Sequence, residues 1–183
     1  MEKQTISEAY LATQKELHKN PSYGMASVSM APMIGQIIKA AKIKSLSDYG
    51  AGKKRLNAAL AEQGLNGYEY LPYDPAFPEY GKPEAADLVC CIDVLEHIEP
   101  ELLSHVLDDL QRITRNLGFF SIHLAPAHKI LPDGRNAHLI QETISWWLLK
   151  LAPRFEVIQL QSHQVYGSGF WVIVRGKQGA GLN

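Results

Sequence analysis

Two short runs of the sequence combine residue types that could do chemistry. The first run is Asp48, Tyr49, Gly50, Ala51 and Gly52. Glycines in a turn let a ligand approach the backbone, and the start of a following helix offers N–H groups to an anionic group. Three interpretations compete for this run alone, namely a dinucleotide site, the phosphate loop of nucleotide hydrolases and a plain turn without a ligand. A dinucleotide site would need a third glycine where Arg55 stands, and the phosphate loop of nucleotide hydrolases is absent.

The second run follows a nearly continuous apolar stretch at 86–92, which is typical of a central parallel strand. Asp93, Glu96 and His97 come directly after it, and ionisable residues at a strand end are costly unless a site uses them. Asp74, beside Pro75, ends the preceding predicted strand at 68–73, where a carboxylate can accept both hydroxyls of a ribose. We expect these residues to share one edge of a sheet.

The elements that position these residues alternate between helical and strand patterns. We predict an α/β fold, a Rossmann-like three-layer αβα sandwich with a mostly parallel sheet. Strands are expected at 44–49, 68–73, 86–92 and 118–124, with a C-terminal antiparallel hairpin of 155–161 and 169–175. Helices are expected at 6–18, around 33–41, and at 53–63, 100–116 and 137–151, the last capped by Asn136, with a loop at 20–30. The segment 75–86 contains Pro78 and Pro83 and is too short for a helix and a strand.

The chain has 183 residues, which predicts one domain with a helical N-terminal lid (1–44), a core (45–175) and a loose tail (176–183). The net charge of -1 argues against bulk binding to nucleic acid, and the lack of a long apolar run argues against a membrane span. The adjacent Cys90 and Cys91 suit strand packing in a reducing, cytoplasmic compartment. Nothing indicates an oligomeric state.

With these features the sequence resembles the class I S-adenosylmethionine-dependent methyltransferases over roughly 45–175. The resemblance rests on Asp-x-Gly-x-Gly at 48–52, on Asp74, and on Asp-Val-Leu-Glu-His at 93–97. It implies that the glycine turn receives the methionine part of S-adenosylmethionine, Asp74 the ribose, and the backbone at 93–96 the methyl-bearing sulfur. The cofactor contacts so implied are Asp48, Tyr49, Gly50, Ala51, Gly52, Asp74, Pro75, Asp93, Val94 and Glu96. Lys53 departs from the family pattern, which has a small residue there. The short segment 75–86 is a second departure, so the third strand that the family usually has should be reduced or missing.

Two regions could recognise a methyl acceptor, namely the N-terminal lid and the run 123–138, which is rich in histidine. The expected acceptor contacts are Tyr23, His97, His128 and Arg135, and His128 or His138 is the candidate base. The sequence does not name the acceptor or its methylated atom, and the nearly neutral charge favours a small molecule.

Three alternatives remain open. A non-catalytic S-adenosylmethionine-binding or scaffolding relative would account for Lys53. Metal-dependent RNA 3′-terminal methyltransferases have a metal-binding pattern similar to Asp-x-x-Glu-His with later histidines. In this sequence Asp93 stands where that pattern has glutamate, and metal-free members of the class share the rest of the motif. No metal is therefore expected. A nucleotide-sugar or NAD-dependent Rossmann enzyme is disfavoured by Arg55 and Asp48. His18 is expected to be a surface or helix-end residue.

Overall fold

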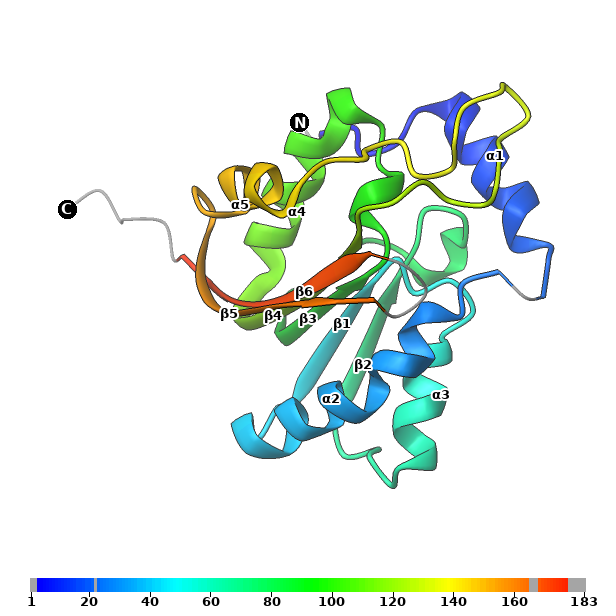
Figure 1. Ribbon diagram of the computed structural model, residues 1–183. Coiled ribbons are helices and arrows are strands. Elements are labelled where there is room, and N and C mark those ends of the chain that lie inside the picture. Colours follow the sequence, from blue (N-terminus) through cyan, green and yellow to red (C-terminus); the bar gives the residue numbers. More distant parts are fainter. Residues whose placement is uncertain (1–2, 22, 165–167, 178–183) are drawn as a thin grey trace.

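The computed structural model describes residues 3–21, 23–164 and 168–177, and its centre is a six-stranded sheet (Figure 1). The strands are β1 (Ser45–Tyr49), β2 (Glu69–Tyr73), β3 (Ala86–Ile92), β4 (Thr114–His123), β5 (Phe155–His163) and β6 (Gly169–Gly176). Their order across the sheet is β2-β1-β3-β4-β6-β5. Neighbours from β2 to β4 are parallel, whereas β6 is antiparallel to both β4 and β5. The predicted parallel sheet with a reversed C-terminal hairpin is confirmed.

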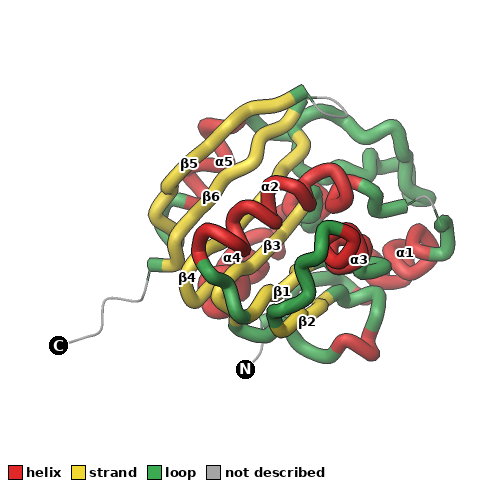
Figure 2. The backbone as a smooth tube through the Cα atoms, turned by 90° about the horizontal axis from the view of Figure 1, so that it is seen from below, coloured by secondary structure: helices red, strands yellow, loops and turns green. Residues whose placement is uncertain are grey.

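Helices cover both faces of this sheet, which confirms the three-layer prediction. In Figures 1 and 2, α2 and α3 lie on one face, α4 and α5 lie on the other, and α1 lies beyond the carboxyl ends of the parallel strands. The helices are α1 (Glu8–His18), α2 (Ala26–Ala41), α3 (Arg55–Glu62), α4 (Leu103–Ile113) and α5 (Ile144–Leu151). Short 3-10 turns occur at Pro78–Tyr80, Leu95–His97 and Pro100–Leu102.

Strand β3 lies at the centre of the core, as its apolar run predicts. Val89 and Cys91 belong to the buried cluster under α4 and α5, whereas Leu88 and Cys90 belong to the cluster under α2 and α3. All four side chains are fully buried, because alternate residues of a strand face opposite sides of the sheet. Both cysteines are free thiols that fill the core.

The missing third strand is also confirmed. In the described chain, the connection from β2 to β3 contains only the 3-10 turn Pro78–Tyr80, and β2 pairs only with β1. Strand β2 is therefore the edge of the sheet. Pro72, which has no N–H to donate, is tolerated in an edge strand.

Three predicted element boundaries were wrong. The helix predicted at 100–116 ends at Ile113, and the strand predicted from 118 begins at Thr114. The helix predicted at 137–151 begins only at Ile144, capped by Thr143 rather than Asn136. The backbone before it bonds to distant partners, since the Ala137 N–H donates to the Lys129 carbonyl and the Ile140 N–H to the Glu96 carbonyl. The predicted loop at 20–30 is too long because α2 begins at Ala26.

The predicted tail is described only to residue 177, and 178–183 lie outside the described residues. No helix in the described part of the chain is long and apolar enough to cross a membrane.

Candidate functional site

The turn after β1 is fixed between two neighbouring elements. Gly50 and Gly52 have φ angles of 85° and 47°, in the left-handed region that favours glycine. A Cβ at Gly50 would lie 2.3 Å from Val94 Cγ2, so a larger residue does not fit without a shift. The N–H groups of Gly50 and Ala51 donate to the Tyr73 carbonyl at 2.8 and 3.0 Å. The turn therefore presents bare backbone in a defined position.

Asp74 follows β2 and connects to the same turn. Its Oδ2 accepts the Gly52 N–H at 3.0 Å, and its Oδ1 accepts the Ala76 N–H at 2.8 Å. Burial raises the pKa of Asp74, and the two backbone hydrogen bonds oppose that shift. Because each carboxylate oxygen has two lone pairs, the group can accept further hydrogen bonds from a pair of hydroxyls.

Asp48 lies inside the carboxyl end of β1. Its side chain is buried, and the Tyr70 hydroxyl donates to its Oδ2 at 2.6 Å. Burial raises the pKa of Asp48 to about 7, although the hydrogen bond from Tyr70 opposes the shift. The carboxyl therefore changes its charge near neutral pH.

Asp93 directly follows β3 in an unusual conformation. Its φ angle is 50°, which is uncommon for a residue other than glycine. The Ser121 hydroxyl donates to its Oδ1, and its own N–H donates to the Ser121 carbonyl at 3.0 Å. These bonds to β4 fix the backbone where Val94 continues toward the glycine turn.

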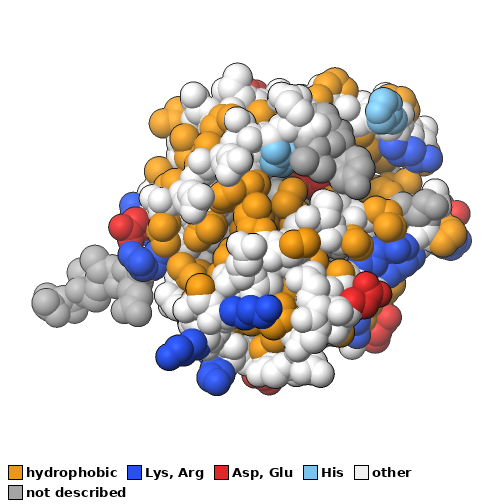
Figure 3. Space-filling view, turned by 60° about the horizontal axis from the view of Figure 1, so that its bottom comes forward, with side chains coloured by type: hydrophobic (Ala, Val, Ile, Leu, Met, Phe, Trp, Pro, Cys, Tyr) orange, Lys and Arg blue, Asp and Glu red, His pale blue; other side chains and the backbone are white. Residues whose placement is uncertain are grey.

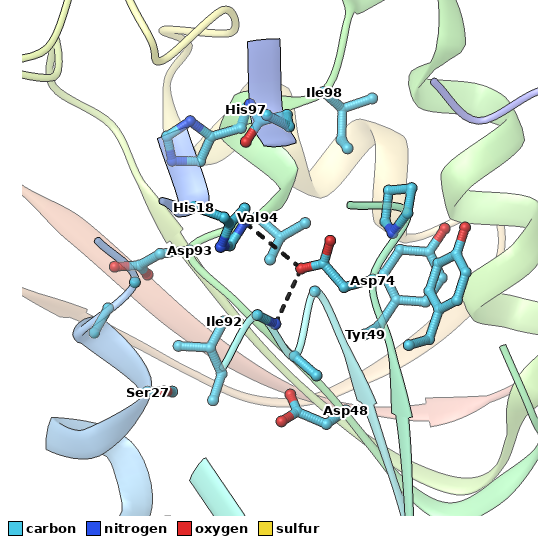
Figure 4. A pocket seen from close by; sticks show the side chains of 18 of the residues that line it. His18, Ser27, Asp48, Tyr49, Asp74, Ile92, Asp93, Val94, His97 and Ile98 are labelled. Atoms are coloured by element: carbon cyan, nitrogen blue, oxygen red, sulfur yellow. Dashed lines mark hydrogen bonds and ion pairs between the residues drawn. The ribbon is translucent and has the colours of Figure 1, made fainter. Parts of the chain in front are cut away.

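These loops surround one cavity at the carboxyl ends of β1, β2 and β3 (Figure 4). Strands β2 and β3 lie on opposite sides of β1, so the cavity is at the point where the strand order reverses. Of the residues predicted to bind the cofactor, all except Glu96 line this cavity. They are Asp48, Tyr49, Gly50, Ala51, Gly52, Asp74, Pro75, Asp93 and Val94.

Comparison with known proteins gives matches among solved structures. No protein-family model matches the sequence, and no curated protein sequence matches it. The 1,6-didemethyltoxoflavin-N1-methyltransferase of Burkholderia thailandensis is 17% identical, with a TM-score of 0.65 over 96% of this chain and 92% of its own. The N-methyltransferase NodS of Bradyrhizobium japonicum is 10% identical, with a TM-score of 0.61 over 94% and 100%. Magnesium protoporphyrin IX methyltransferase of Synechocystis is 12% identical, with a TM-score of 0.59 over 93% and 92%.

The chain has the class I methyltransferase fold. The first two of these structures contain S-adenosylhomocysteine and the third contains S-adenosylmethionine.

In this methyltransferase fold, α1 contributes one face to the cavity. Tyr10, Gln14 and His18 are four residues apart, so they share a helix face, and all three line the cavity. His18 Nε2 lies 3.9 Å from Asp74 Oδ2, as the dashed line in Figure 4 shows. The sequence prediction placed His18 correctly at a helix end, but its side chain points inward instead of to the surface. The four-residue spacing was the signal that could have identified this face.

Two cations attach the N-terminal segment to the glycine turn. Lys53 Nζ donates to the Asn20 carbonyl at 2.6 Å, and the Arg55 guanidinium donates to the Pro21 carbonyl. Lys53 is the residue that departs from the family pattern. In this methyltransferase fold it contacts the segment that covers the cavity.

Tyr23, His97 and His138 also line the cavity. His97 Nδ1 lies 2.7 Å from the Ala137 carbonyl, and His138 Nδ1 lies 2.6 Å from the Ala125 carbonyl. Burial lowers the pKa of His97 to about 4, and burial also lowers the pKa of His138. Both imidazoles are therefore neutral at pH 7.

The other predicted acceptor residues lie elsewhere. His128 and Arg135 are exposed, and neither is among the residues that line the cavity. Arg135 Nη2 forms an ion pair with Asp133 Oδ2 at 2.7 Å. The Arg135 Cζ lies 5.7 Å from the centroid of the Tyr10 ring. Of the two candidate bases, His138 therefore lines the cavity and His128 lies at the surface.

Proposed function

We propose that this protein is an S-adenosylmethionine-dependent methyltransferase whose acceptor is a small molecule. One observation carries the proposal: the Gly52 N–H bonds to Asp74, and both residues border the same cavity as Asp93. A carboxylate able to accept two hydroxyls lies next to bare backbone, which fits a nucleoside that carries an amino-acid chain. The relatives named above bind that nucleoside in the same fold, which supports the proposal.

When bound, S-adenosylmethionine supplies a methyl group on a sulfonium sulfur, and its transfer is an in-line displacement. The residues of this chain then have to align the reactants and exclude water. Asp74 accepts the ribose hydroxyls, and the turn 50–52 lies along the amino-acid portion. The backbone at Asp93 and Val94 borders the reacting end. Tyr10 and Tyr23 cover the cavity from the N-terminal segment.

The acceptor side offers two neutral imidazoles, those of His97 and His138, beside the apolar Ile98. The unprotonated nitrogen of a neutral imidazole can accept a hydrogen bond from a hydroxyl or amine of the methyl acceptor. It can also take the proton of that group. Two observations favour a small acceptor. The N-terminal segment borders the cavity, and on the face in Figure 3 acidic side chains lie among the separate groups of Lys and Arg. The relatives that bind toxoflavin precursors or porphyrins give further support.

Calorimetric titration tests the cofactor assignment. The wild-type protein is titrated with S-adenosylmethionine, S-adenosylhomocysteine and NAD, and we expect only the first two to bind. Asp74→Asn should weaken binding of S-adenosylhomocysteine by about 10- to 150-fold, because hydrogen bonds to a charged group contribute about 1.5–3 kcal/mol.

Asp87→Asn is the matched control. Asp87 also accepts two backbone N–H groups, from Lys44 at 2.9 Å and Ser45 at 3.2 Å, but at the opposite end of β1. Its variant should bind as the wild type does. Binding of NAD alone, or equal loss in both variants, would overturn the proposal. Release of S-adenosylhomocysteine in the presence of a panel of small acceptors distinguishes turnover from a scaffolding role.

A further inference from the structure

Three side chains beside the cavity bring their ligand atoms together. Glu96, His97 and His138 each offer one such atom, and these atoms lie within 4.8 Å of one another. Glu96 is fully buried. Its Oε1 accepts the His123 N–H at 2.9 Å, whereas its Oε2 has no hydrogen-bond partner among the described residues. A buried carboxylate oxygen without a partner is costly.

The hydrogen bonds of the two histidines determine which nitrogen is free. Because the Ala137 and Ala125 carbonyls can only accept, each Nδ1 must carry the proton. Nε2 of a neutral imidazole is then a bare lone pair. The cluster thus contains two imidazole nitrogens and a carboxylate oxygen that all accept. Metal-bound histidines show the same arrangement, with the other ring nitrogen donating to a carbonyl or carboxylate.

We propose that Glu96, His97 and His138 bind one divalent metal ion of the zinc type. Two imidazoles and one carboxylate suit Zn²⁺, Fe²⁺ or Co²⁺, whereas Mg²⁺ and Ca²⁺ prefer oxygen ligands alone. Ligands bound at about 2.1 Å to a tetrahedral ion lie about 3.4 Å apart, so the longest of the three separations has to shorten by up to about 1.4 Å when the ion binds. From the sequence we weighed a metal-binding pattern at Asp93 to His97 with later histidines and expected no metal. His138 is remote along the chain, and only the fold places it beside Glu96 and His97.

The position of the cluster indicates what the ion does. His97 and His138 line the cavity and Glu96 lies behind them, so open coordination positions face the acceptor side. This part of the inference rests on the proposed function. It assigns the acceptor to compounds with a hydroxyl or carboxylate that can bind the ion, and His138 is then a metal ligand and not a base.

Metal binding is measured without any methyl donor. Protein without a polyhistidine tag is dialysed against EDTA, freed of chelator and titrated with Co²⁺, whose visible absorption reports nitrogen and oxygen ligation. We expect one ion per chain, displaced by one equivalent of Zn²⁺ and not by millimolar Mg²⁺.

Two variants remove ligands and retain the local hydrogen bonds. Glu96→Gln keeps an oxygen for the His123 N–H, and His138→Asn keeps an N–H donor for the Ala125 carbonyl. Each should weaken Co²⁺ binding at least about 10-fold, since even outer-shell changes cost that much. His128→Asn, at an exposed histidine outside the cavity, is the matched control and should bind as the wild type does. Circular dichroism confirms that each variant is folded.

Absence of Co²⁺ binding by the wild type, or binding that the two ligand variants leave unchanged, would overturn the metal site. If Glu96 is instead protonated and donates a hydrogen bond to Nε2 of one histidine, no Co²⁺ will bind. That result also counts against the metal site. Titration with S-adenosylhomocysteine in EDTA separates the two proposals. If S-adenosylhomocysteine binds normally in EDTA and the wild type binds no Co²⁺, the proposed function stands and only the metal site is overturned.

Discussion

Replacing Gly50 with alanine should destabilise the protein by about 2–5 kcal/mol, and this change tests how the glycine turn is held. The first contribution is conformational, because a side chain at φ 85° costs about 1–2 kcal/mol. The second is steric, because the new Cβ would lie 2.3 Å from Val94 Cγ2, and such overpacking costs about 1–3 kcal/mol. The β-branched Val94 side chain is restricted at χ1, so it cannot easily turn away.

Gly64→Ala separates the two contributions. Gly64 has a φ of 74°, but nothing lies within 4 Å of the position of its Cβ. We expect this control to lose only about 1–2 kcal/mol. Adding Val94→Ala to Gly50→Ala removes the steric contact, so the double variant should be more stable than the sum of the two single changes predicts, by about 1–3 kcal/mol.

Urea unfolding followed by circular dichroism measures these differences. The slope m should stay constant while the midpoint changes, so that the shift reports stability. Equal losses of stability in Gly50→Ala and Gly64→Ala, with no coupling between positions 50 and 94, would contradict a steric contact between the new Cβ and Val94. In that case the turn would not be fixed by Val94.

Two further variants test the charges around the cavity. The pKa of Asp48 in the folded protein is about 7, above its ordinary value, so proton binding to this carboxyl stabilises the folded state at low pH. That contribution, up to about 4 kcal/mol, is lost as pH rises from about 4 to about 7. Asp48→Asn, which still accepts the Tyr70 hydroxyl, should lack this loss in urea titrations across that range, and an unchanged pH dependence would contradict the assignment. Lys53→Met removes the 2.6 Å bond to the Asn20 carbonyl. We expect less than about 1 kcal/mol of lost stability but faster hydrogen exchange in α1, and unchanged exchange would show that Lys53 does not hold the segment.

The shortened sheet changes the wall beside the glycine turn. Residues 77–80 occupy the connection where the family pattern has a third strand. The Phe77 ring packs between His18 and Tyr80, with centroid distances of 5.0 and 5.2 Å. The Tyr80 hydroxyl donates to the Gly52 carbonyl at 2.9 Å. An aromatic pair therefore supports the turn without a strand.

The sequence by itself determined the parts of the protein that depend on neighbouring residues. The apolar run at 86–92 predicted β3, and the glycines at 50 and 52 predicted a turn that requires left-handed backbone. The short segment 75–86, compared with the pattern of the class I methyltransferases, predicted the missing strand. Because parallel strands end at one edge of a sheet, even the meeting of Asp48, Asp74 and Asp93 followed from local patterns.

Only the tertiary structure decided which remote side chains reach that edge. Helix spacing gave Tyr10, Gln14 and His18 a common face, but the packing of α1 over the strand ends directed it inward. Backbone hydrogen bonds from residues 137–140 to distant carbonyls replaced the expected helix and brought His138 to Glu96 and His97. The same loop left His128 exposed. Spacing along the chain cannot distinguish these outcomes, because each depends on contacts between segments far apart in sequence.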